Sequence, residues 1–219
     1  RYGKERSKAM DTLIYILFVA IFIPILLMAL LVDKKSRFPI IFVLVGIFIS
    51  VFASEINGYI RNMTNLEISK FVVMVTPITE EILKSIPVFY LALLISDKKE
   101  TLFTASMSTG IGFAILENAY YLLQNTGNFN MIDAIIRAFG AGLMHGMCTL
   151  LIGVGISFVK KKKKMFSISI FALLSTAITY HSIYNMLIQS EYSLWGALFP
   201  IATYIPFLAW RIFKKQKNN

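Results

Sequence analysis

The apolar residues of this chain are gathered in long runs, and short polar segments separate one run from the next. A bilayer core about 30 Å thick is crossed by roughly 20 helical residues, which is close to the length of most of these runs. Seven candidate membrane-spanning helices result, over residues 12–32, 38–54, 71–95, 101–123, 131–158, 165–188 and 192–210. The sequence therefore predicts an all-α fold, a polytopic transmembrane helical bundle of about seven helices. The short second run leaves a total of six or eight open.

The polar segments between the runs are brief, with one exception. Residues 55–70 form a longer connection that is polar enough to lie at the membrane surface. No internal repeat, low-complexity tract or linker divides the chain. We therefore expect one membrane-embedded domain over residues 1–219, with its polar motifs in a core of about residues 70–190.

Composition excludes several classes of protein. The chain is 57% hydrophobic and only 16% charged, which is too apolar for a soluble domain of 219 residues. Its net charge of +10 comes from lysines and arginines in short runs between apolar segments, as in membrane anchors. The bilayer is thus the expected partner, and nucleic acid is not. The single cysteine, Cys148, excludes a disulfide framework and a thiolate zinc site.

The basic residues also predict an orientation, because loops rich in lysine and arginine stay on the cytoplasmic side. Most of them collect on one side of the predicted bundle: Lys34, Lys35, Arg37, Lys98, Lys99, residues 160–164, Arg211, Lys214, Lys215 and Lys217. We therefore expect a multi-pass protein of the cell membrane with a cytoplasmic C-terminus. With seven spans, the N-terminus lies outside.

A few ionisable residues lie inside the predicted spans, where charge is costly and commonly functional: Glu80, Glu81, Lys84, Glu117, Arg137, His145 and His181. The helical rise places Glu80 roughly 14 Å and His181 roughly 12 Å from the outer ends of their helices. Glu117 lies about six residues from the outer end of its helix, and His145 is deeper, roughly 20 Å along a long, tilted helix. Four helices therefore bring titratable groups to one layer, in the outer half of the membrane.

Three pairs of polar residues lie four positions apart and so share a helix face: Glu80 with Lys84, His181 with Asn185, and Asp133 with Arg137. The first pair predicts an internal carboxylate and ammonium contact. The second predicts an imidazole and a carboxamide that face one cavity, and the third predicts a structural ion pair.

Prolines and small residues predict how these helices are shaped and packed. Pro77 and Pro87 flank the turn that carries Glu80, so this helix is expected to be kinked or locally opened. Two sets of small residues at four-residue spacing predict close helix contacts: Ser106, Gly110 and Ala114, and Gly142 with Gly146.

Four motifs occur in order along the chain: Glu80-Glu81-x-x-Lys84, Gly112-Phe113-Ala114-x-x-Glu117-Asn118, Arg137 followed by His145, and His181-x-x-x-Asn185. In this order and spacing they resemble the PrsW family of bacterial membrane proteases, relatives of the CAAX prenyl-protease and Abi superfamily. The resemblance spans roughly residues 70–190. The PrsW pattern ends its last motif in aspartate, whereas Asn185 is the form found in CAAX proteases.

The resemblance implies an intramembrane endopeptidase that cuts a membrane-anchored protein. In PrsW itself the substrate is a single-span anti-sigma factor, cleaved on its extracytoplasmic side. That side agrees with the outer position derived above from charge and helical rise. PrsW proteins are described as metallopeptidases, whereas the CAAX relatives are read as glutamate-dependent.

Peptide hydrolysis needs water, a base that activates it, and donors for the oxyanion. In one version Glu80 is the base, Glu81 or Glu117 is the second carboxylate, and His145, His181 and Asn185 orient groups or bind the oxyanion. In the other, a zinc ion lies on His145, His181 and a glutamate, for which Glu81 is the candidate. The His-Glu-x-x-His signature of soluble zinc proteases is absent, so both versions stay open.

Two functions of other classes also place ionisable groups in a membrane. A proton-coupled transporter buries glutamates and histidines, but commonly shows inverted repeats that this sequence lacks. A non-catalytic scaffold of the same fold would keep the polar groups for folding alone. Substitution of Glu80 and of His181 by alanine separates the enzyme, which folds without activity, from the scaffold, which does not fold.

Overall fold

The computed structural model describes residues 2–124, 131–159 and 166–217. Described side chains exclude those of residues 2–12, 133, 159, 207, 208 and 210–217. The predicted turns at 125–130 and 160–164 and the predicted pair of Asp133 with Arg137 therefore lie outside the described residues, as do the basic side chains at both chain ends.

The described chain is all-α. Its elements are α1 (Tyr2–Leu31), α2 (Lys34–Met63), α3 (Ile68–Met74), α4 (Thr76–Tyr90), the π-helical turn η1 (Leu91–Ile95), α5 (Lys99–Gln124), α6 (Met131–Val159), α7 (Phe166–Ile188) and α8 (Ser193–Lys217). Each of the seven predicted runs corresponds to one of these helices or, for the third run, to α3, α4 and η1 together.

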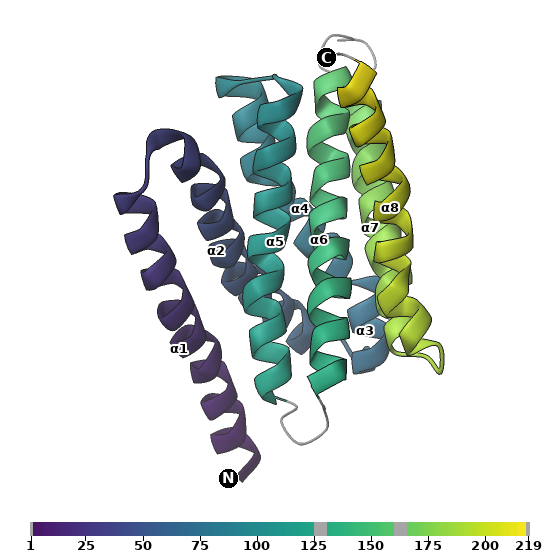
Figure 1. Cartoon of the computed structure of the whole chain (residues 1–219). Helices are drawn as coiled ribbons and strands as arrows, with labels where there is room; N and C mark the ends of the chain where they lie inside the picture. Colours follow the sequence, from purple (N-terminus) through teal and green to yellow (C-terminus); the bar gives the residue numbers. More distant parts are fainter. Residues whose placement is uncertain (1, 125–130, 160–165, 218–219) are drawn as a thin grey trace.

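The helices form an elongated bundle in which α5 and α6 are central (Figure 1). Helix α5 packs between α2 and α6, α1 lies outermost against α2, and α7 and α8 cover the other side of α6. Helix α4 contacts α2, α5, α6 and α7. It therefore lies, like α5 and α6, in the interior of the bundle.

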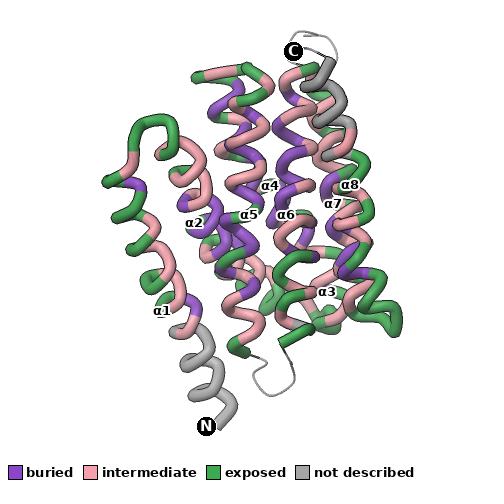
Figure 2. The backbone as a smooth tube through the Cα atoms, in the orientation of Figure 1, coloured by how far each residue is buried: buried purple, intermediate pink, exposed green. Residues whose placement is uncertain are grey.

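Apolar side chains cover much of the outside of the bundle. In Figure 2 the buried segments lie mainly where α2, α5 and α6 face their neighbours, whereas exposed segments run along the outer side of α1. Leu30 and Leu31 of α1 are 63% and 87% exposed. Four helical segments of the described chain are long and apolar enough to cross a membrane: Leu13–Leu31, Lys34–Met63, Ala134–Phe158 and Phe166–Ile188. The protein is thus a multi-pass membrane protein.

The polar connection predicted at residues 55–70 is largely helical, because α2 continues to Met63. Two of its polar side chains, Glu55 and Asn57, have hydrogen-bond partners on neighbouring helices. Glu55 accepts a hydrogen bond from Tyr15 of α1 at 2.5 Å, and Asn57 accepts one from Thr79 of α4 at 2.5 Å.

At its other end, α2 is capped by Asp33. Hydrogen bonds from Ser36 and Lys35 hold the pKa of this carboxyl below its usual value.

The third run is broken, as its prolines predicted. Helix α3 ends at Met74, and α4 begins at Thr76 with Pro77 in its first turn. Pro87 lies inside α4 and has no N–H to donate, and the chain changes to a π-helical turn four residues later. The break at Val75 separates a short helix, α3, that packs against α7.

Close approach of α5 to its neighbours depends on glycine. A Cβ atom at Gly110 would collide with the backbone of His145 and lie 2.7 Å from the Cα of Gly146. This confirms the predicted small-residue contact on α5. The expected role of Gly142 is wrong, because a Cβ atom there would meet nothing within 4 Å.

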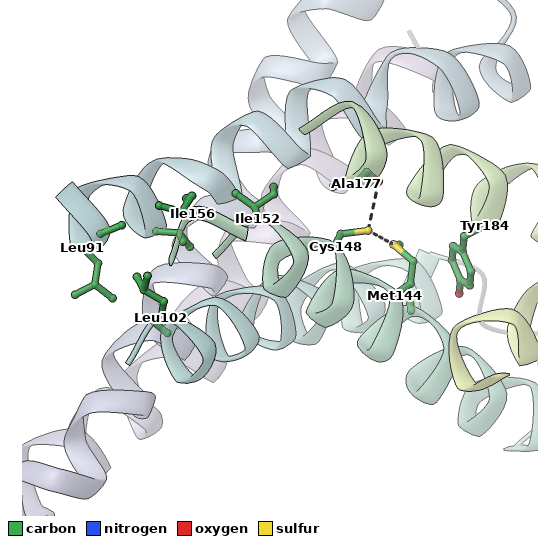
Figure 3. Close-up of a cluster of buried hydrophobic side chains, with 12 residues drawn as sticks. Leu91, Leu102, Met144, Cys148, Ile152, Ile156, Ala177 and Tyr184 are labelled. Carbon is green, nitrogen blue, oxygen red and sulfur yellow. Dashed lines mark hydrogen bonds between the residues drawn. The ribbon is translucent and has the colours of Figure 1, made fainter. Parts of the chain in front are cut away.

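The main hydrophobic cluster lies among α4, η1, α5, α6 and α7 (Figure 3). Cys148 is one of its members, and the thiol donates to the carbonyl oxygen of Ala177 at 3.4 Å. Leu91 and Leu102 lie at one end of this cluster and Tyr184 at the other, beyond Met144. The cysteine is thus a packing residue, in keeping with its position in an apolar run.

Candidate functional site

Four helices bring ionisable side chains together in the interior of the bundle. Helix α4 contributes Glu80, Glu81 and Lys84, and α5, α6 and α7 each contribute one more, namely Glu117, His145 and His181. All are at least 95% buried as residues except Glu117, whose side chain is 32% exposed. The predicted convergence of these groups is confirmed by the contacts described next. We refer to these six residues as the polar cluster.

Helix α4 contributes three residues of the polar cluster because it buries its polar face and exposes its apolar face, the inverse of a helix in a soluble protein. The face that includes Glu80 and Glu81 is buried, whereas Ile78, Ile82 and Ile86 are 42%, 45% and 55% exposed. In a soluble protein the isoleucines would be inside and the charges outside. In a lipid bilayer the arrangement is reversed, with isoleucines outside and charges inside. Lipid solvates the apolar side chains, whereas the charged ones need protein partners.

The four-residue spacing predicted that Lys84 pairs with Glu80, but Lys84 pairs with Glu81. Its Nζ lies 2.6 Å from Oε1 of Glu81, three residues earlier. The same carboxylate oxygen lies 2.8 Å from Nδ1 of His181. Glu81 therefore connects an ammonium on its own helix to an imidazole on α7, and both of its partners are fully buried.

The second histidine is held by the same lysine. Nδ1 of His145 lies 2.7 Å from Nζ of Lys84. The ring of Phe113 covers this contact, with its centroid 4.6 Å from the ammonium and 4.9 Å from the imidazole centroid. Lys84 donates both contacts when it is charged, so the ring proton of a neutral His145 is then on Nε2. Both imidazoles are thus fixed through Nδ1, and their Nε2 atoms face elsewhere.

The Nε2 side of the two imidazoles faces carboxylates. Oε2 of Glu80 lies 3.9 Å from Nε2 of His181, and Oε2 of Glu117 lies 2.5 Å from Nε2 of His145. Nε2 of His145 and Oε2 of Glu117 thus contact each other, whereas Oε2 of Glu80 is buried and has no hydrogen-bond partner among the described residues. Buried polar atoms without partners are rare, so a group that binds Oε2 of Glu80 is expected here.

One set of donors fits a metal ion. Glu80, His145 and His181 each offer one ligand atom, and these three atoms lie within 4.8 Å of one another. Two imidazole nitrogens and one carboxylate oxygen are a ligand set of catalytic zinc sites. The hydrogen bond of His181 to Glu81 through its other nitrogen is the usual support for such a ligand. The donor set therefore fits a metal, with Glu80 in the place we had expected for Glu81.

Glu117 is the carboxylate of the polar cluster that is open to the outside. Its Oε1 lies 3.7 Å from Nη2 of Arg137, while its Oε2 faces His145. The guanidinium of Arg137 lies over the ring of Tyr121, 3.5 Å from the centroid. A cation on an aromatic face is held in a fixed plane. Glu117 therefore lies between a buried imidazole and a positioned positive charge.

Asn185, expected beside His181 in the polar cluster, makes a different contact. Its Nδ2 donates to the carbonyl oxygen of Val72 at 3.0 Å and so joins α7 to α3. This contact exists because the chain breaks at Val75 and α3 turns toward α7. Asn185 thus holds two helices together one turn away from the imidazole.

The sequence reasoning missed Tyr184. This residue is 2% exposed, and its hydroxyl has no hydrogen-bond partner among the described residues. A tyrosine in an apolar helix is ordinarily a packing residue, so the apolar run by itself does not indicate a function for Tyr184. Its position three residues after His181, on the same side of α7, was the available signal.

A bundle of apolar helices with buried carboxylates and imidazoles set for a metal defines a membrane-embedded, metal-dependent hydrolase. The sequence matches the PrsW family of intramembrane metalloproteases over residues 34–211, and the chain belongs to this family. The match extends from α2 into α8, beyond the four helices whose motifs carried the resemblance. Neither the curated proteins nor the solved structures contain a significant match to the chain.

Proposed function

We propose that this protein hydrolyses a peptide bond of a membrane-anchored protein at the polar cluster, with a metal ion on Glu80, His145 and His181. The observation that carries the proposal is the convergence of one ligand atom from each of these three residues, together with the buried, unpartnered Oε2 of Glu80. A bound metal such as zinc supplies Lewis-acid polarisation of the scissile carbonyl and of water. The remaining residues of the cluster then have distinct tasks.

Glu81 and Lys84 support the two imidazoles. Glu81 accepts from Nδ1 of His181, which fixes that ring and directs its Nε2 lone pair toward the ligand group. Lys84 contacts Nδ1 of His145 and neutralises Glu81. For Nε2 of a neutral His145 to bind a metal, the ring proton must be on Nδ1, so one proton leaves the pair of His145 and Lys84 and Nζ then accepts from Nδ1. Both residues act on the ligands and not on the substrate.

Glu117 is the general base in this proposal. Its side chain is 32% exposed, so water and substrate reach it, whereas Glu80 is enclosed. One of its oxygens faces Nε2 of His145, and the other is near Arg137. This assignment exchanges the roles that the sequence predicted, where Glu80 was the base and Glu117 a second carboxylate.

The topology that goes with this function has seven spans, with α5, α8 and the α3, α4 and η1 segment crossing in addition to the four apolar spans. The turn between α1 and α2 and the turn between η1 and α5 lie at the same end of the bundle (Figure 1). Lys34 begins α2 directly after the first of these turns, and Lys98 lies in the second. We propose that this end and the C-terminus are cytoplasmic, which places the polar cluster in the outer half of the membrane.

We further propose that residues 1–219 form one protease domain and that the substrate has a single membrane span. An anti-sigma factor is the candidate, because the PrsW pattern is matched at Glu80, Glu81 and Lys84. Asn185, which differs from that pattern, lies outside the ligand group and does not oppose it. Cleavage is expected on the extracytoplasmic side.

The test combines metal analysis with cleavage. Purified protein is analysed for bound metal and incubated with a single-span reporter, before and after a chelator. We expect bound zinc, cleavage, loss of both with the chelator, and recovery on adding zinc. Glu67→Gln, an exposed glutamate whose side chain makes no capping bond, is the matched control for Glu80→Gln and should behave as wild type.

Other outcomes identify the alternatives. Full cleavage by metal-free protein would replace this proposal with the glutamate-dependent version. A folded protein that cleaves no membrane substrate but takes up protons or solutes in vesicles would favour the transporter. Loss of folding on substitution of Glu80 or His181 by alanine would favour the scaffold.

A further inference from the structure

The hydroxyl of Tyr184 is a buried polar group that packing does not explain. The residue is 2% exposed, and its ring belongs to the main hydrophobic cluster. A phenylalanine would fill the same space without a polar atom. Burial of a donor without a partner is destabilising, so an unpartnered hydroxyl here calls for a ligand that it meets in function.

Tyr184 lies next to the polar cluster on its outer side. It follows His181 by three residues on α7, so the two side chains are neighbours on one face. A Cβ atom at Gly140 of α6 would lie 3.4 Å from the hydroxyl, which places this oxygen against the α6 backbone.

The position corresponds to the approach of a substrate. Figure 3 shows Tyr184 at the end of the hydrophobic cluster opposite Leu91 and Leu102. The end it occupies is the one where α5 finishes and α6 starts, and there Glu117 is the cluster residue open to the outside. The hydroxyl therefore lies at the end of the hydrophobic cluster nearer to Glu117, three residues along α7 from a member of the ligand group.

We propose that the hydroxyl of Tyr184 donates a hydrogen bond to the oxyanion that forms during peptide hydrolysis, an inference that rests on the proposed function. Glu117 takes one proton from water, the water oxygen bonds to the carbonyl carbon, and the carbonyl π pair moves onto its oxygen. Tyr184 keeps its proton throughout and donates to that oxygen. The C–N bond then breaks, Glu117 returns the proton to the leaving nitrogen, and a carboxylic acid and an amine result.

The distinguishing test is Tyr184→Phe in the full-length protein, with metal content, thermal unfolding and kinetics measured together. An oxyanion donor acts in the transition state, so kcat should fall about 100- to 1,000-fold with KM nearly unchanged. Bound metal should be equal to wild type. The unfolding temperature should stay the same or rise, because the hydroxyl removed has no partner in the resting protein.

Tyr180→Phe is the matched control, one helical turn away. The hydroxyl of Tyr180 is 2.5 Å from Oγ1 of Thr203 and so has a structural role between α7 and α8. This variant should lose some thermal stability and keep its kcat. A phosphonate peptide that mimics the tetrahedral oxyanion should bind Tyr184→Phe more weakly than wild type, whereas an uncleaved substrate peptide should bind both equally.

The outcomes separate this inference from the proposed function. Cleavage by wild type together with an unchanged kcat in Tyr184→Phe overturns the inference and leaves the proposed function intact. A fall in kcat that only follows a loss of folded protein or of bound metal also overturns it. A wild-type protein that is folded, metal-loaded and inactive overturns both.

Discussion

Helices α1 and α6 both have the length and apolar character of a membrane span, yet they use that character differently. Only 11% of the apolar stretch of α1 is buried in the protein, against 61% of that of α6, although α1 is the more apolar of the two. In a soluble protein the more apolar helix would be the more buried. Lipid solvates α1, whereas α6 carries His145, Thr149 and Arg137 and needs protein partners for them.

The comparison shows where specificity lies in this fold. The outward face of α1 has a solvent that accepts any apolar side chain of suitable size. The interior around α6 has particular partners for each polar atom, at distances such as 2.7 Å between Nδ1 of His145 and Nζ of Lys84. Substitutions should therefore have very unequal effects in the two regions.

The largest effect is expected at the ligand group. Glu80→Gln keeps the size of a side chain whose Oε2 has no aligned partner, but it removes the charge that a metal needs. Cleavage should fall below detection and bound metal should decrease, while the unfolding temperature stays near that of wild type. Zinc content by mass spectrometry and reporter cleavage measure this. Retained metal with retained cleavage would show that Glu80 is not a ligand.

The next effect is on stability. Lys84→Met leaves Glu81 buried beside His181 without its ammonium, and removal of one partner of a buried ion pair costs about 3–5 kcal/mol. Detergent-solubilised protein should unfold at a clearly lower temperature. The double variant Glu81→Gln/Lys84→Met removes both charges and should recover part of the loss. Equal stability of Lys84→Met and wild type would mean that the pair contributes nothing to the fold.

Close packing of α5 on α6 gives a smaller effect. Gly110→Ala places a Cβ atom against the His145 backbone, and such overpacking costs about 1–3 kcal/mol. Because it displaces the helix that carries a ligand, cleavage should also fall. Gly142→Ala is the control on α6, where the new atom meets nothing within 4 Å and stability should hold or improve. The pair is compared by thermal unfolding and by cleavage of one reporter.

The smallest effects test the comparison of α1 with α6 directly. Ile152→Val removes one methylene from a fully buried side chain of α6 and should cost about 0.5–1.5 kcal/mol. Leu30→Ala removes three carbons from a side chain of α1 that is 63% exposed, and should change stability by less than about 0.5 kcal/mol. A larger loss for Leu30→Ala would place a protein partner on the outer face of α1.

Much of the fold and the site was predictable from the sequence. Hydrophobic runs mark the helices, and the helical rise gives the depth of each polar group in the bilayer. The predicted meeting of Glu80, Glu117, His145 and His181 needed only the depth of each group in its helix. Partner choice was not predictable at this level. Residues three and four positions away share a face equally well, so the rotamer of Lys84 decides for Glu81 over Glu80.

Contacts that depend on the break between two helices could also not be predicted from the sequence. Asn185 reaches Val72 because α3 is a separate short helix, and the sequence predicted a kink near Pro77 without the direction that α3 takes. The predicted packing role of Gly142 was wrong for a related reason. Two glycines at four-residue spacing show where a close contact is possible, but not which neighbour occupies the face.

The inverted pattern of α4 has a consequence for how the protein is made. On insertion scales an ionised residue at the middle of a helix costs about 2.5–3.5 kcal/mol, whereas each isoleucine returns only about 0.3–0.6. Glu80, Glu81 and Lys84 together exceed what Ile78, Ile82 and Ile86 recover. Helix α4 is therefore expected to insert poorly by itself, because its charged side chains need the partners that α6 and α7 supply. We expect assembly of the polar cluster to accompany insertion of the helices made after α4.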